Sequence, residues 1–142
     1  MPTVNFYILN SDSERERQFF ACKLAEKAFR SGFKSYILTD SSYQAEQLDR
    51  LLWTFRPNSF VPHALNNTPL PNSANAILIG EQTAPECWQH TVINLSQHCP
   101  EAMGASENIF ELLDNDEARK QAGRLRYRQY KEQGFPPKTH KI

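Results

Sequence analysis

Residues 4–39 read VNFYILNSDSERERQFFACKLAEKAFRSGFKSYILT, and this stretch decides the fold class. Val4–Leu9 mixes β-branched, aromatic and aliphatic residues, which is typical of a buried strand. The capping-box pattern Ser13-x-x-Glu16 predicts the start of a helix, and Gly32 suits the position just past its end. Lys34–Thr39 predicts a second strand. A strand, a helix and a second strand in this order favour a βαβ unit with a parallel sheet.

The same rhythm continues along the chain. Ser41-x-x-Gln44 predicts a second helix, and three further segments predict strands: Ala76–Gly80, Val92–Ser96 and Asn108–Leu113. The expected fold is a single α/β domain over residues 1–135, with a largely parallel sheet flanked by helices, similar to mononucleotide-binding folds. Because Pro136-Pro137 prevents a helix from continuing, residues 136–142 are expected to form a flexible tail.

Length and composition narrow the class of protein. The chain has 142 residues, of which 39% are hydrophobic and 11% aromatic, too many for a disordered chain. No apolar run approaches the ~20 residues that a membrane helix needs. The first residues lack the basic start and the small-residue cleavage site of a signal peptide, so a cytoplasmic location is expected.

Several kinds of catalytic or cofactor site find no support in the sequence. The first strand is followed by Asn10-Ser-Asp-Ser-Glu14 instead of glycines, so the backbone cannot closely approach a pyrophosphate. A zinc site built from His90, His98 and their neighbours Cys87 and Cys99 is disfavoured, because an extended segment would separate the two histidines by ~26 Å. We therefore expect no cofactor, no metal and no catalytic activity.

The last predicted helix carries the strongest charge signal. Half of the 16 basic residues lie in the final 25 positions. The pattern Asp114-x-x-Glu117 predicts that this helix begins with Asp114 as its cap and reaches about Gln133. Helical spacing groups its side chains into two faces. The face expected to pack on the sheet holds Ala118, Ala122 and Leu125, and the other face holds Lys120, Arg124, Tyr127, Arg128 and Lys131.

This basic face has more than one interpretation. Guanidinium groups bind carboxylates bidentately, and a Tyr ring beside Arg stems forms an apolar wall, so the face suits an acidic and hydrophobic ligand. A nucleic-acid backbone is the alternative, with the helix acting as a direct binder of single strands. A third hypothesis, a small enzyme using a nucleotide or a flavin, lacks the necessary glycines.

A second candidate surface lies in the Pro-rich stretch from Thr54 to Asn75. Its start is unusually apolar, with Trp53, Phe55, Phe60 and Val61. These side chains either fold back over the edge of the sheet or remain exposed for a protein partner.

Three segments resemble a known family, the chi subunits of bacterial DNA polymerase III holoenzyme, also called HolC. The first is Asn5-Phe-Tyr-Ile-Leu9. The second runs from Leu48-Asp-x-x-Leu-Trp53 to Ser59-Phe-Val-Pro-His63. The third is Arg126-Tyr-Arg-Gln-Tyr130 followed by Gly134-Phe135. The likeness covers essentially the whole chain in order.

The resemblance implies an accessory subunit of DNA replication that bridges two partners and has no chemistry of its own. One partner would be the psi subunit of the clamp loader, at Trp53 and Phe60, where an accessory helicase of the iron–sulfur type can also bind. The other would be the acidic, Phe-ended tail of single-stranded-DNA-binding protein. The tail-binding positions would be Lys120, Arg124, Tyr127 and Arg128, with Leu113 as an apolar wall. DNA itself would be contacted mainly through these partners, and Arg128 stands where the family usually has Lys.

Overall fold

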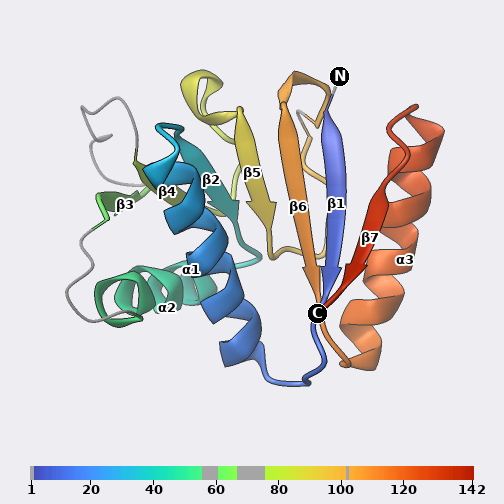
Figure 1. Cartoon of the computed structure of the whole chain (residues 1–142), viewed down its shortest axis with the longest axis horizontal. Helices are drawn as coiled ribbons and strands as arrows, with labels where there is room; N and C mark the ends of the chain where they lie inside the picture. The colour runs from blue at the N-terminus through green and yellow to red at the C-terminus, as the bar shows by residue number, and fades with distance from the viewer. Residues whose placement is uncertain (1, 56–60, 67–75, 102) are drawn as a thin grey trace.

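The computed structural model describes residues 2–55, 61–66, 76–101 and 103–142. They form one α/β domain with a seven-stranded sheet in the order β3-β4-β2-β5-β6-β1-β7, in which every neighbouring pair is parallel (Figure 1). The strands are β1 (Thr3–Ile8), β2 (Ser35–Leu38), β3 (His63–Leu65), β4 (Ile77–Gly80), β5 (Thr91–Asn94), β6 (Asn108–Leu113) and β7 (Lys138–Lys141). The helices are α1 (Glu14–Arg30), α2 (Ser42–Thr54) and α3 (Glu117–Glu132), with the short 3-10 turns η1 (Glu86–Trp88) and η2 (Met103–Ala105).

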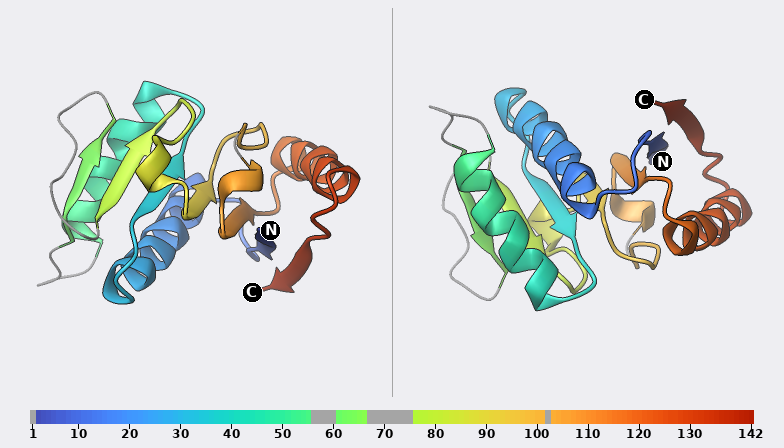
Figure 2. Two further views of the ribbon diagram at one scale, coloured as in Figure 1. Left: turned by 90° about the horizontal axis from the view of Figure 1, so that it is seen from above. Right: turned by 90° about the horizontal axis from the view of Figure 1, so that it is seen from below.

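The helices divide between the two faces of the sheet. Figure 2 shows α1 and α2 on one face and α3 on the other. Ile37, Ile79 and Ile93 lie in the main apolar core with α1 and α2. Phe6 and Ile109 point to the opposite face, where they join a smaller cluster with Tyr130 of α3. This alternation along buried parallel strands puts a hydrophobic layer on each side of the sheet.

The predicted starts of α1 and α2 are confirmed. The Ser13 side chain accepts a hydrogen bond from the Glu16 backbone N–H, and the Ser41 side chain accepts one from that of Gln44. Gly32 follows α1 with a φ of 88°, a backbone conformation that costs glycine least. Local capping chemistry of this kind depends on residues close in sequence, and it could therefore be predicted without the tertiary structure.

Within residues 136–142, expected to form a flexible tail, Lys138–Lys141 form strand β7 beside β1. His140 stacks on Tyr7, with ring centroids 5.0 Å apart, and its Nε2 lies 2.8 Å from Asn5 Oδ1. The Ile142 N–H donates to the Ile8 carbonyl at 2.9 Å. Each of these contacts joins residues near the two ends of the chain. A local sequence pattern around Pro136 therefore could not have predicted strand β7.

The predicted packing face of α3 is wrong for Ala118 and Leu125, while Ala122 is half-buried. Leu125 is 58% exposed and Ala118 is exposed as well, whereas Gly123, Arg126 and Tyr130 are buried. Arg126 and Tyr130 are buried because both donate hydrogen bonds to the carboxylate of Glu111 in the sheet. Periodicity of the apolar residues misidentified the inner side, since the buried side of this helix includes Arg126 and Tyr130, which bind a buried carboxylate.

Candidate functional site on the last helix

The start of α3 is fixed by two aspartates with different tasks. Asp116 is the cap, and its Oδ2 accepts from the Arg119 backbone N–H at 3.0 Å. Asp114, predicted to be the cap, instead pairs with the Arg119 side chain at 2.7 Å and accepts from the Asp116 N–H. Burial opposes ionisation of Asp114, but these hydrogen bonds and the nearby Arg charges outweigh it and hold the pKa of Asp114 below its ordinary value.

The underside of α3 is anchored by Glu111 in β6. This fully buried carboxylate accepts from Arg126 Nε at 2.9 Å, from Tyr130 Oη at 2.6 Å and from Asn94 Nδ2 at 2.9 Å. Burial raises the pKa of Glu111 above its ordinary value, and the Arg126 charge with the three donors works against that rise. A buried charge that is paired and fully hydrogen-bonded fixes the rotation of the helix about its own axis.

This anchor escaped the sequence-based prediction of a site, although it determines which residues of α3 remain exposed. Two signals could have revealed it. Glu111 interrupts the apolar run Ile109–Leu113 of β6, and Arg126 and Tyr130 are spaced four apart on the following helix. A charge inside a buried strand needs a partner of opposite charge, and that spacing puts both donors on one side of a helix.

The basic residues predicted on α3 do share the exposed side of the helix. Arg124 and Arg128 are exposed, and among the residues that the structure describes neither has an ion-pair partner. Lys120 is half-buried, and its Nζ lies 3.3 Å from Glu117 Oε1. We call Lys120, Arg124, Tyr127, Arg128 and Lys131 the basic face of α3.

Tyr127 joins the basic face to the sheet. Its ring lies 5.4 Å from that of Phe6, and its hydroxyl is 3.5 Å from the Pro137 carbonyl oxygen. The Lys131 Nζ lies 5.9 Å from the same ring. The ring is therefore held in one position with one side covered, and it offers a fixed apolar surface between cations.

Leu113 does not lie on this face. It is 7% exposed and packs beneath α3 at Gly123, where an added Cβ would meet Leu113 Cδ1 at 2.5 Å. A glycine at this position allows the helix to approach the end of β6 closely. Leu113 thus supports the helix from below.

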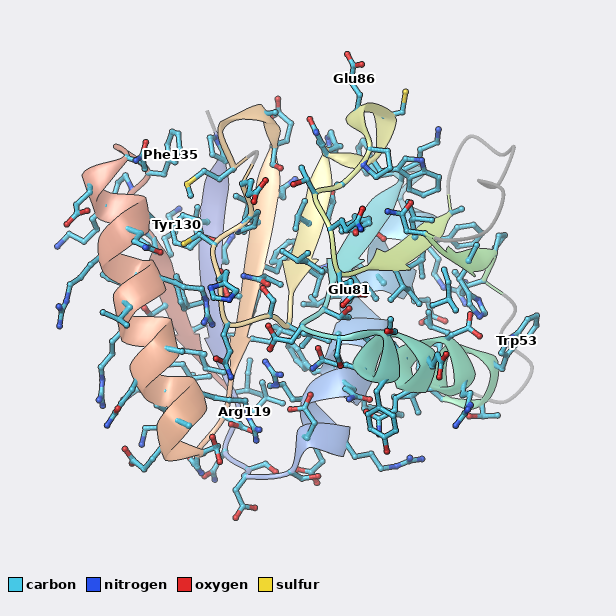
Figure 3. All side chains as sticks on the ribbon, turned by 180° about the vertical axis from the view of Figure 1, so that it is seen from behind. Trp53, Glu81, Glu86, Arg119, Tyr130 and Phe135 are labelled. Carbon is cyan, nitrogen blue, oxygen red and sulfur yellow. The ribbon has the colours of Figure 1, made fainter. Side chains whose placement is uncertain are left out.

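The second candidate surface lies at the other end of the sheet. Trp53, at the end of α2, is 58% exposed, and its ring lies 4.8 Å from that of His63 in an edge-on arrangement. Asp49 Oδ1 is 3.4 Å from His63 Nε2. Phe60, which sequence reasoning grouped with Trp53, lies outside the described residues. Figure 3 shows Trp53 and the labelled residues of α3 on opposite sides of the molecule.

The carboxyl edge of the sheet, where mononucleotide-binding folds hold their ligands, has a different use here. A cavity of about 220 Å³ lies there among residues that include Arg17, Arg119 and Glu14. Arg17 donates to the carbonyls of Leu95 and Leu112 and also pairs with Glu14. Arg17 thus ties the ends of β5 and β6 to α1, while Arg119 pairs with Glu14 and Asp114, so both cations already have carboxylate partners. Across the described residues, no cluster of three metal-ligating side chains and no helix able to cross a membrane is found.

Comparison with known proteins extends this description. The model of the family "DNA polymerase III chi subunit, HolC" matches residues 1–138. The chain is 32% identical to the DNA polymerase III subunit chi of Pseudomonas aeruginosa over 142 residues, which covers 100% of this chain and 98% of that protein. It is 32% identical to the DNA polymerase III subunit chi of Haemophilus influenzae, over an alignment that covers 99% of this chain and 97% of that protein. It is 26% identical to the Escherichia coli subunit chi over 95% of each. A match of this extent over the whole domain, on the fold described above, shows that the chain belongs to the HolC family, the chi subunits of DNA polymerase III.

Proposed function

We propose that this chain is a non-catalytic adaptor in DNA replication. Its basic face on α3 binds the acidic C-terminal tail of single-stranded-DNA-binding protein, and its Trp53 end binds the psi subunit of the clamp loader. The Trp53 end is also the surface on which an accessory iron–sulfur helicase would dock. Family membership supports a role within DNA polymerase III, and the separation of the two surfaces across the sheet supports a bridging role.

The observation that carries the tail-binding role is the pair of exposed guanidinium groups, those of Arg124 and Arg128, beside the aromatic ring of Tyr127. Arg124 and Arg128 are one helical turn apart, and each can take a carboxylate bidentately. Each such contact contributes about 0.2–1 kcal/mol when exposed, and about 1.5–3 kcal/mol when the peptide shields it. The Tyr127 ring and the Arg stems would receive the terminal Phe. We assign Leu113 the role of supporting the helix, since its side chain is covered.

The test is a calorimetric titration of the full chain with an acidic peptide ending in Asp-Ile-Pro-Phe, beside the same peptide without its Phe. The peptide that ends in Phe should bind, and the peptide without its Phe should not. Arg124→Ala should weaken binding by about tenfold, the equivalent of roughly 1.4 kcal/mol. Arg15→Ala, an exposed arginine of α1, is the matched control and should leave the affinity unchanged.

Two results would count against this function. If Arg124→Ala and Arg15→Ala have equal affinity, the basic face does not hold the tail. If neither peptide binds but an oligo-dT does, with affinity falling steeply as salt rises, α3 is a direct binder of single-stranded nucleic acid.

A further inference from the structure

Strand β7 leaves one edge of the sheet open. It is the last strand in the sheet order, and within the described residues no strand lies along its outer side. The Ile142 N–H donates inward to the Ile8 carbonyl, so the backbone groups of His140, two residues earlier, also face β1. By the same alternation, the N–H and C=O groups of Thr139 and Lys141 point outward, away from the sheet.

The start of this open edge lies near the basic face of α3, because the Tyr127 hydroxyl is 3.5 Å from the Pro137 carbonyl oxygen, one residue before β7. In the register of β1 and β7, Phe6 is opposite Thr139 and Ile8 is opposite Lys141. Phe6 faces α3, because its ring contacts those of Tyr127 and Tyr130. The side chains of Thr139 and Lys141 therefore lie on the α3 side of the sheet, and Figure 2 shows β7 joined to α3 by the segment that follows the helix.

We propose that an acidic peptide binds to this chain as an added strand along the outer edge of β7, with its carboxylates directed at the basic face of α3. The proposal rests on the tail-binding role argued above and gives that role a geometry. Main-chain hydrogen bonds to Thr139 and Lys141 supply affinity that does not depend on side chains, as in other cases of strand addition. Arg124 and Lys131 lie three positions before and four after Tyr127, so they share its side of α3 and line the same path.

The charge of β7 selects an acidic strand. Lys138 and Lys141 are exposed, and lysines on an edge strand normally prevent other strands from joining the sheet. A second copy of β7 would bring Lys against Lys, which is destabilising. A strand rich in Asp would instead place opposite charges across the new pair. The same residues that exclude a further copy of this chain thus favour an acidic partner.

Backbone amide exchange tests the geometry directly. On saturation of the full chain with the acidic peptide ending in Asp-Ile-Pro-Phe, exchange at the Thr139 and Lys141 N–H groups should slow by at least tenfold. Exchange at His140, already paired with β1, should stay within twofold. Peptides N-methylated at alternate acidic residues should divide into two sets, one with affinity reduced at least tenfold and one unchanged, because only every second amide of an added strand faces β7.

Two variants separate this proposal from the function on which it rests. Thr139→Pro removes an outward N–H without removing a bond to β1, and proline is tolerated on edge strands at such positions. It should lower peptide affinity at least tenfold, while Thr139→Val should not. If Arg124→Ala weakens binding but Thr139→Pro and the N-methylated series do not, the peptide lies on α3 alone and strand addition is overturned. If Arg124→Ala has no effect, both proposals fail. Should Thr139→Pro fold poorly, the exchange and N-methylation experiments decide with the unmodified chain.

Discussion

A carboxylate stands in the middle of β6, at Glu111, with no exposed surface and three hydrogen-bond donors around it. We expect Tyr130→Phe to lower the free energy of unfolding by about 1.5–3 kcal/mol, since it removes a hydrogen bond to a buried charge. Tyr127→Phe makes the same chemical change three residues away, where the hydroxyl has only a 3.5 Å contact, and should stay within about 0.5 kcal/mol. Urea unfolding of both variants measures the difference, and equal losses would show that Glu111 does not anchor the helix.

Asp114 should make the free energy of unfolding depend on pH. Its pKa is lower in the folded chain than in the unfolded one, so its contribution is fully present above the ordinary carboxyl pKa and is lost as pH falls through the folded value. Asp114→Asn should therefore lower stability at pH 7 and flatten the fall in stability between pH 5 and pH 3. Urea midpoints at pH 7, 5 and 3 provide the measurement. A variant whose acid dependence matches that of the original chain would contradict this assignment.

At the scale of elements, α3 depends on its first turn. Asp116→Ala should cost about 1 kcal/mol of stability, within the range of about 0.5–2 kcal/mol for a lost N-cap, because the Arg119 N–H loses its acceptor. Asp116→Ser keeps an acceptor oxygen and should restore most of that loss. Thermal unfolding with far-UV circular dichroism measures both. If Asp116→Ser lowers stability as much as Asp116→Ala, the loss of stability does not come from the capping hydrogen bond.

The sequence predicted elements whose causes are local and missed those whose causes are distant. The caps Ser13 and Ser41 were found because their partners lie three residues away. The orientation of α3 was missed because Glu111 in β6 decides which side of the helix is buried. Strand β7 was missed because its partner, β1, begins at the third residue of the chain. The basic face was nevertheless identified, since helical spacing groups Arg124, Tyr127 and Arg128 whichever side is buried.

At the scale of the whole molecule, the sheet separates the two candidate surfaces. The Trp53 surface is next to β3 at one end of the strand order, and α3, which carries the basic face, packs on β6 and β1 toward the other end. The sheet between them is a continuous parallel ladder with apolar side chains packed on both faces. A rigid spacer of this kind allows two partners to bind at once without contact between them, which is what an adaptor needs.

This separation predicts independent effects on the two partners. Trp53→Ala should leave affinity for the acidic peptide unchanged and weaken association with psi, as should Phe60→Ala on the basis of the family resemblance. Arg124→Ala should do the reverse. Because the two sites lie toward opposite ends of the strand order, the free-energy changes in a double variant should add to within about 0.3–0.5 kcal/mol for each partner. Calorimetry with the peptide and with purified psi gives the binding free energy of each variant for each partner. Melting temperatures show whether each variant is folded. A loss of both activities from Trp53→Ala with an unchanged melting temperature would mean that the two ends are coupled through the sheet and that the rigid-spacer explanation is wrong.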